Sequence, residues 1–443
     1  MIRVLRTELR RSSALWIGPL LAIAGAAMLY LLFRSWGSRW MALALWQRDF
    51  LYILWPLAMG AGGWLGRRDS RSRMGELLGT TARPSWQRAI PTAGALAIAL
   101  ALGYVVTFAA AGIQVAPLAG YFAPGSLAVV AIGALSLVAA GLCGLGVGRW
   151  LPSAFTPPGL VVLGLAVMVL PPTLNLAFTG GEADPSALLL APVLLIFDRE
   201  FTTVVPSVHA GQALWFGGLA LTGFALFAAA QLRDRLLALA PAGLGVVLAL
   251  VVLPPSGEAS ITEPDPKAAA LVCADGTPKV CVTAVHSRAL DELREPGREA
   301  LRILAAKLPQ APASVAESPT SWIYENSRPQ RADTLLVELR VEADGAPDTS
   351  RRDLLWELLE GAGTRRCENT VNDHIEARLA VAAWLLDQPP PARIWGGDTE
   401  KVIAKLRTLP AAEQVKRVAE FRRASLSCEN RDLAAIITGD AAR

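Results

Sequence analysis

Seven long apolar stretches constrain the fold of this chain more than any other feature of its sequence. They run near residues 14–33, 50–66, 89–113, 125–148, 158–178, 210–231 and 236–253. A bilayer core of ~30 Å is crossed by about 20 predominantly apolar helical residues, so each stretch has the length of a span or nearly so. We therefore expect an α-helical polytopic membrane domain over residues 1–255.

The composition changes at Pro254-Pro255-Ser256-Gly257. The chain of 443 residues is 53% hydrophobic, but the residues that follow have the mixture of charged and short apolar side chains found in a soluble protein. A segment of about 185 residues is long enough to form a core of its own. We expect a second domain over residues 257–443.

The distribution of arginine predicts the orientation, because positive residues near span ends are retained in the cytoplasm. If the N-terminus is inside, the arginines on the cytoplasmic side are Arg3, Arg6, Arg10, Arg11, Arg67, Arg68, Arg71, Arg73, Arg83, Arg88, Arg149, Arg233 and Arg235. Those on the other side are Arg34, Arg39, Arg48 and Arg199. This asymmetry favours a cytoplasmic N-terminus, and an odd number of spans then places the second domain outside.

Cysteine usage agrees with that placement, because disulfides persist in oxidising compartments outside the cytoplasm. Cys273 and Cys281 flank the sequence ADGTPK, whose Asp-Gly pair is a hairpin signal, so we expect these two cysteines to be bridged. Cys367 and Cys428 are then left to pair with each other. Four cysteines allow three connectivities, and the alternative of four unpaired buried thiols in a cytosolic domain also stays open.

Periodicity in the second domain indicates an α+β fold. We expect strands near residues 270–273, 279–284 and 334–342, and helices near 286–308, 351–361, 368–387, 399–407, 411–424 and 430–437. The Pro/Ala/Ser-containing stretch over residues 308–319 is expected to be a loop.

The apolar stretch SALLLAPVLLIF, residues 186–197, is too short to cross a membrane. We interpret it as an interfacial or re-entrant helix between the fifth and sixth spans, with an ordinary loop as the alternative. Inside the spans, Gln114, Asn175 and Gln212 are the main polar candidates for the interior, and no charged residue falls in the middle of a predicted span. A charge relay therefore has little support.

The connection between the second and third spans, residues 66–88, is the most informative cytoplasmic segment. Met74, Leu77 and Leu78 recur at helical spacing on one face, while Arg71 and Glu76 carry charge elsewhere. Pro84 limits the extent of such a helix. This pattern predicts a short amphipathic helix near residues 68–84 that docks on another protein; a generic basic connector is the alternative.

Together with the basic N-terminal sequence MIRVLRTELRRSS, the segment GELLGTTARPSWQR at residues 75–88 resembles ABC transporter permeases of the type-2 exporter class. The resemblance covers roughly residues 1–235. It implies a six-span core, to which this chain adds a seventh span and the outer domain. It also implies a coupling helix that rests on a nucleotide-binding subunit; the docking residues here would be Arg68, Arg71, Met74, Glu76, Leu77 and Leu78.

ATP has to be bound by a separate subunit if the resemblance holds. A P-loop requires a lysine directly after a glycine, and none of the six lysines of this chain has a glycine before it. We expect no cofactor in this chain, with ATP and Mg²⁺ held by a partner P-loop ATPase. A complete exporter would also need a second permease subunit, either the same chain or a paralogue, in the lipid of a bacterial cell membrane; the residue usage is that of a GC-rich bacterium.

Enzymatic readings of the outer domain are weak. The three histidines lack the H-E-x-x-H spacing of zinc peptidases, and the group Asp373, His374 and Glu376 is better explained as a solvated helix face. A net charge of +4 without basic-aromatic clusters excludes a nucleic-acid partner. The sequence thus favours a non-enzymatic exporter subunit that moves an apolar or amphipathic substrate. The alternative is a membrane-anchored extracytoplasmic binding, sensor or enzyme domain.

Overall fold

The computed structural model is mostly helical and divides into two compact units. It describes residues 14–31, 36–68, 84–179, 186–194, 196, 200–254, 258–319, 330–367, 375–389, 399–428 and 431–439. Unit 1 consists of Met1–Pro117 and Phe122–Pro264, and unit 2 consists of Leu118–Tyr121 and Asp265–Arg443. Unit 2 is therefore built from two separate segments of the chain.

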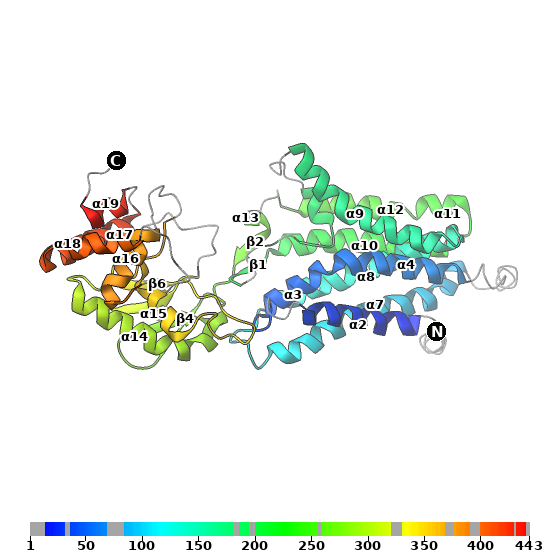
Figure 1. The fold of residues 1–443 in the computed structure, drawn as a ribbon. Coiled ribbons are helices and arrows are strands. Elements are labelled where there is room, and N and C mark those ends of the chain that lie inside the picture. Colours follow the sequence, from blue (N-terminus) through cyan, green and yellow to red (C-terminus); the bar gives the residue numbers. More distant parts are fainter. Residues whose placement is uncertain are drawn as a thin grey trace. The chain divides into compact units, whose positions relative to one another are not determined.

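Unit 1 is a bundle of apolar helices (Figure 1). Its helices are α2 (Ala14–Leu31), α3 (Trp40–Asp49), α4 (Leu51–Gly66), α7 (Ser85–Val115), α8 (Gly125–Trp150), α9 (Thr156–Thr179), α10 (Pro206–Ala228), α11 (Leu232–Leu237), α12 (Ala240–Val252) and α13 (Glu258–Ile261). The remaining elements are the 3-10 helix η2 (Ser186–Leu190) and the strands β1 (Thr202–Val204) and β2 (Thr262–Pro264).

Four helices in the described part of the chain are long and apolar enough to cross a membrane. They cover Ser85–Val115, Gly125–Trp150, Pro206–Ala228 and Leu232–Val252, the last of which joins α11 to α12. Trp16–Leu31 and Thr156–Leu170 are shorter apolar helices. Six helices, α2, α4, α7, α8, α9 and α10, and the α11–α12 pair coincide with the seven apolar stretches of the sequence, of which four reach the length and composition of a span in the described part of the chain.

The centre of the bundle is α8, which packs against α4, α7 and α10 (Figure 1). Glycine allows the closest of these approaches. A Cβ atom added to Gly62 of α4 would overlap the backbone of Gly141, and one added to Gly144 of α8 would overlap the backbone of Met59. Small residues at a helix interface let two backbones approach in this way, which favours association of apolar helices in lipid.

A short antiparallel pair of strands closes one end of the bundle. In this pair Thr202 of β1 lies opposite Pro264 of β2, and Val204 lies opposite Thr262. Because β1 directly precedes α10 and β2 follows α12, the N-terminus of α10 and the C-terminal side of α12 are held at the same end of unit 1.

Unit 2 contains a four-stranded sheet in the order β3-β4-β5-β6. Its strands are β3 (Leu271–Cys273), β4 (Lys279–Thr283), β5 (Ser314–Glu317) and β6 (Thr334–Val337); β3 and β4 are antiparallel, whereas β4, β5 and β6 are parallel. Its helices are η3 (Ala284–Ala289), α14 (Leu290–Lys307), α15 (Arg351–Leu359), η4 (Glu360–Ala362), α16 (Ile375–Leu386), α17 (Thr399–Arg407), α18 (Ala411–Ser427) and α19 (Leu433–Thr438).

The core of unit 2 forms where α14 covers the sheet. Leu293, Leu301 and Leu304 of α14 are buried in one cluster with Val280 of β4 and Val315 of β5. This spacing places the three leucines on one face of the helix, as an amphipathic helix on a sheet requires. Parallel strands need a crossover connection of this kind, because a tight turn cannot join them.

The prediction of a loop over residues 308–319 is wrong for β5. Ser314–Glu317 forms an inner strand between β4 and β6. The sequence SVAE has a single β-branched residue, so its own strand preference is weak. Pairing on both edges stabilises it instead, which is a tertiary effect that local composition does not reveal. The predicted strand at 334–342 is shorter than expected, because β6 ends at Val337.

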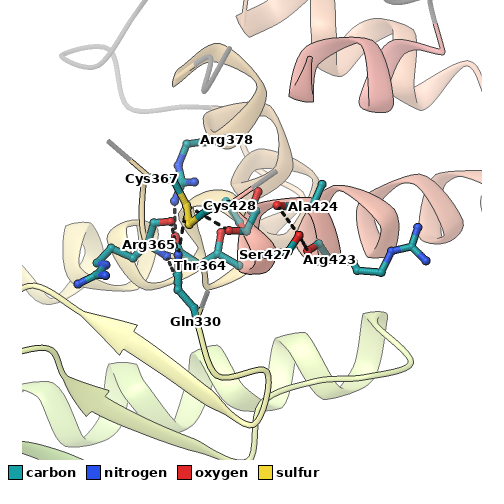
Figure 2. The surroundings of a disulfide bond; sticks show 11 residues. Gln330, Thr364, Arg365, Cys367, Arg378, Arg423, Ala424, Ser427 and Cys428 are labelled. Atoms are coloured by element: carbon teal, nitrogen blue, oxygen red, sulfur yellow. Dashed lines mark hydrogen bonds between the residues drawn. A yellow bond between two sulfur atoms is a disulfide. The ribbon is translucent and has the colours of Figure 1, made fainter. Parts of the chain in front are cut away.

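Both disulfides in the described part of the chain lie in unit 2 and join the expected partners. Cys273 and Cys281 face each other across β3 and β4. Cys367 and Cys428 join the segment after η4 to the C-terminal end of α18 (Figure 2). Beside the second bridge, the side chain of Gln330 accepts a hydrogen bond from Arg365 N and donates one to Arg365 O, each 2.7 Å long.

Candidate functional site

Most of the predicted docking helix near residues 68–84 lies outside the described residues. Arg71, Met74, Glu76, Leu77 and Leu78 lie outside the described residues. Arg68 is described, and it is exposed just beyond the C-terminal end of α4. The docking residues therefore stay a prediction from the sequence.

A buried arginine marks the most unusual polar site in unit 1. Arg48 lies in the last turn of α3, and none of its surface is exposed. Its Nε donates to Pro192 O at 2.6 Å, and its Nη1 donates to Val129 O at 3.3 Å. Its Nη2 donates to Gln212 Oε1 at 2.7 Å. Three chain segments that are far apart in the sequence are joined by this one side chain.

Gln212 extends the same network from the second turn of α10. Its side chain is fully buried, and its Nε2 donates to Leu189 O at 2.8 Å. Trp215 lies three positions after Gln212 on the same face of α10, and its Nε1 donates to Leu190 O at 2.9 Å. The carbonyl groups of residues 189–192 are thus held by side chains of α3 and α10. We call Arg48, Gln212 and Trp215 the segment-binding residues.

The segment over residues 186–197 was expected to be a short interfacial or re-entrant helix. Its first part is the 3-10 helix η2, Ser186–Leu190, and Val193 and Leu194 are buried. Backbone carbonyls away from water have to be paired, because each unpaired group is costly in apolar surroundings. The segment-binding residues supply those donors, which explains how a non-helical backbone is accommodated against the bundle.

Further polar side chains lie next to the segment-binding residues. Gln47, beside Arg48 in the chain, is buried and donates from Nε2 to Tyr104 O at 2.7 Å. The Tyr104 ring is fully buried, and its hydroxyl lies against Gly133, one helical turn after Val129 on α8. His209 precedes Gln212 by one turn on α10 and so shares its face.

Three of these side chains, those of Gln47, Tyr104 and His209, have polar atoms without a hydrogen-bond partner among the described residues. Gln47 Oε1, Tyr104 Oη and both ring nitrogens of His209 are buried without a hydrogen-bond partner in the described ranges. Unpaired buried polar atoms are rare in folded proteins and concentrate at functional sites. We therefore take the segment-binding residues with Gln47, Tyr104 and His209 as the candidate functional site.

The sequence identified only part of this site. Gln212 is in the interior as expected, whereas Gln114 is part-exposed and bonds to the Tyr30 hydroxyl. The side chain of Asn175 lies outside the described residues. Arg48 was assigned to an outer connection, although the run Gln47-Arg48-Asp49 has apolar sequence on both sides. Charges so placed are expensive in a membrane protein, and that signal points to a buried functional residue.

The electrostatics of the site follow from the acceptors of Arg48. All three are neutral oxygens, two of them backbone carbonyls. A guanidinium with donors in a fixed fork can bind several carbonyl oxygens at once, which an ammonium on a flexible stem does less well. A second charged contact joins the same elements, because Arg39 before α3 pairs with Glu200 before β1. The arrangement holds the connection between α9 and α10 against the bundle.

Unit 2 has a separate buried polar group where β4 and β5 end. Glu317 accepts from Thr283 N at 2.7 Å and from Thr283 Oγ1 at 2.8 Å through one oxygen. Its other oxygen lies 2.5 Å from His286 Nδ1, and both side chains of this pair are 1% exposed. The contacts fix the ends of two neighbouring strands to η3. Their burial favours a structural role over direct contact with a ligand.

Metal-binding and catalytic arrangements were also sought in the part of the chain that the structure describes. No group of three or more His, Cys, Asp or Glu side chains there is placed to hold a metal ion. Asp373 and His374 lie outside the described residues, and Glu376 is in the first turn of α16.

Comparison with known proteins gives no relative for this chain. No family model, no curated protein and no solved structure matches it.

Proposed function

We propose that this chain is the membrane-embedded permease subunit of an ATP-driven exporter that resembles the type-2 ABC class. The six-span core would be α2, α4, α7, α8, α9 and α10, and α12 with α11 would be the seventh span. The observation that carries the proposal is the bundle around α8, with a short segment held against it between the last two core helices. An anchor for an outer domain needs one span, whereas this architecture suits a protein that acts within the membrane.

The orientation in this proposal has the N-terminus in the bacterial cytoplasm and unit 2 outside. The arginine distribution supports it through the positive-inside rule. The two disulfides of unit 2 support it independently, because an oxidising compartment keeps them formed. The connection between α4 and α7 then faces the cytoplasm, where an ATPase subunit is available to it.

Energy would come from a partner P-loop ATPase that binds ATP and Mg²⁺. The amphipathic pattern of Met74, Leu77 and Leu78 supports docking of that partner on the connection between α4 and α7. A second permease subunit, either this chain or a paralogue, would complete the exporter. Lipid would cover the helix faces whose large apolar side chains are exposed, such as those of α9 and α12.

The candidate functional site would lie toward the outer end of the transport path in this orientation. It is formed at the starts of α8 and α10, which follow connections on the outer side. There the segment-binding residues would hold residues 189–192 in place and limit opening of the bundle on that side. Most of the other buried side chains of the described bundle are apolar, which suits an apolar or amphipathic substrate better than a small ion.

The orientation can be measured with reporter fusions in a bacterial host. Alkaline phosphatase fused after Arg443 is expected to be active, because the enzyme folds only outside the cytoplasm, and a green fluorescent protein at the same position is expected to be dark. Truncation after Arg235 removes the last span and should reverse both signals. A fluorescent full-length fusion with inactive phosphatase would place unit 2 in the cytoplasm and overturn the proposed seven-span arrangement.

A further inference from the structure

The turn between α7 and α8 belongs to unit 2, although both helices belong to unit 1. Leu118–Tyr121 is grouped with Asp265–Arg443, and the residues on either side of it, Pro117 and Phe122, are grouped with the bundle. The sequence gives no sign of this division, because the turn is only a short connection between two long apolar helices. We call Leu118–Tyr121 the strap.

A hydrogen bond fixes one end of the strap. The Tyr121 hydroxyl donates to Asp265 Oδ2 at 2.9 Å. The other carboxylate oxygen of Asp265 accepts from Lys267 N at 3.0 Å and from Ala268 N at 3.2 Å, so the carboxylate is itself held in position by its own turn. Partial burial, followed by the bond to Asp265, raises the pKa of Tyr121 to about 12, so its hydroxyl stays protonated and able to donate at neutral pH.

Close backbone packing fixes the middle of the strap. A Cβ atom added to Gly120 would lie 2.6 Å from Ala284 O and would also overlap the Ser287 side chain. Since Ala284 O is a backbone atom at the start of η3, it cannot move away as the end of a flexible side chain could. On the other side lies Gly345, whose φ of +82° suits glycine; a Cβ atom added there would lie 3.4 Å from Leu118 O, in van der Waals contact.

We infer that unit 2 binds the strap as an integral part of its fold, so that the fold of unit 2 needs the chain segment between α7 and α8 as well as the residues from Asp265 onward. Asp265, Ala284, Ser287 and Gly345 form the receiving surface, and its partner is one specific turn of the same chain. The chain therefore passes between unit 1 and unit 2 at three places: before Leu118, after Tyr121 and after Pro264.

One consequence for transport rests on the proposed function. If α7 and α8 move during a transport cycle, the strap must either carry unit 2 with it or break its contacts with Asp265 and η3. The test below reads the stability of unit 2 and needs neither substrate nor ATPase, so its outcome is independent of the transporter proposal.

The test is pulse proteolysis of the full-length protein in detergent across a urea series, read from a tag after Arg443. Gly120→Leu is expected to lower the urea midpoint of unit 2, although position 120 lies between two apolar helices. Tyr121→Phe removes one hydrogen bond to a charged group and should raise the unfolding equilibrium constant of unit 2 about tenfold. Gly159→Leu is the matched control, because a Cβ there meets nothing within 4 Å.

A double-variant comparison separates the strap contact from general damage. Asp265→Ala combined with Tyr121→Phe should cost no more stability than the larger of the two single changes, since both remove the same bond. If Gly120→Leu does not fold, the comparison of Tyr121→Phe with Asp265→Ala still decides the result. Unchanged urea midpoints for unit 2 in Gly120→Leu and Tyr121→Phe, or fully additive effects at positions 121 and 265, would overturn the inference.

Discussion

Replacement of Arg48 by methionine is expected to lower the free energy of unfolding of unit 1 by about 3 kcal/mol, because three buried neutral acceptors then lose their donor. Methionine has a similar length but donates no hydrogen bonds. Val129 O, Pro192 O and Gln212 Oε1 would be left without their present donor. Each buried acceptor without a partner costs about 1–3 kcal/mol.

The measurement for Arg48 is unfolding in mixed detergent micelles, followed by the far-ultraviolet circular dichroism of the full-length protein. Arg233→Met is the matched control, because Arg233 is exposed on α11. Arg48→Lys should recover only part of the stability, since one ammonium group does not reproduce the fork that reaches three acceptors. Equal stability of Arg48→Met and Arg233→Met would show that the buried network contributes nothing.

Removal of the Cys367–Cys428 bridge is expected to destabilise unit 2 more than removal of Cys273–Cys281. The two bridges close loops with sequence separations of 61 and 8 residues. Loss of chain entropy in the unfolded state gives stabilisations of about 4 and about 2.5 kcal/mol for loops of these sizes. The longer bridge also lies beside the Gln330–Arg365 hydrogen bonds, which tie the start of the β6 segment to the same region (Figure 2).

The comparison uses two variants of the full-length protein, Cys367→Ala with Cys428→Ala and Cys273→Ala with Cys281→Ala. Urea unfolding of unit 2 by pulse proteolysis should give the lower midpoint for the first pair. The second pair serves as the control, because it removes the same number of sulfur atoms. A lower midpoint for the Cys273 and Cys281 pair would contradict the loop-length argument.

The apolar helices of unit 1 could be predicted from the sequence because their apolar runs are long, and four of those described reach the length and composition of a membrane span. Within the described residues α8 begins at Gly125, where its apolar run begins. Helix α3 was missed because it has only 10 residues and ends in Gln47-Arg48-Asp49, which looks like an exposed end. Its burial depends on α8 and α10, and a pattern within one segment carries no information on such neighbours.

In unit 2, too, features that depend on contacts between distant segments could not be predicted from local sequence patterns. The β3–β4 hairpin could be predicted from a local turn signal and two cysteines at hairpin spacing. Strand β5 could not, because its strand form depends on pairing with β4 and β6. The buried pair of His286 and Glu317 lies 31 positions apart in the sequence, and parallel pairing of β4 with β5 brings the two residues together. The strap likewise contacts residues that are far from it in the sequence, such as Asp265.

If this chain works with a separate ATPase, as we propose, the two proteins should co-purify from the native host. The tagged wild-type chain would be extracted in mild detergent beside a variant with Glu76→Arg and Leu78→Asp in the proposed docking helix. A control with Glu292→Arg and Leu271→Asp makes matching changes at exposed positions of unit 2. We expect a P-loop ATPase with the wild type and the control but not with the docking variant; absence of any ATPase from all three would contradict the account.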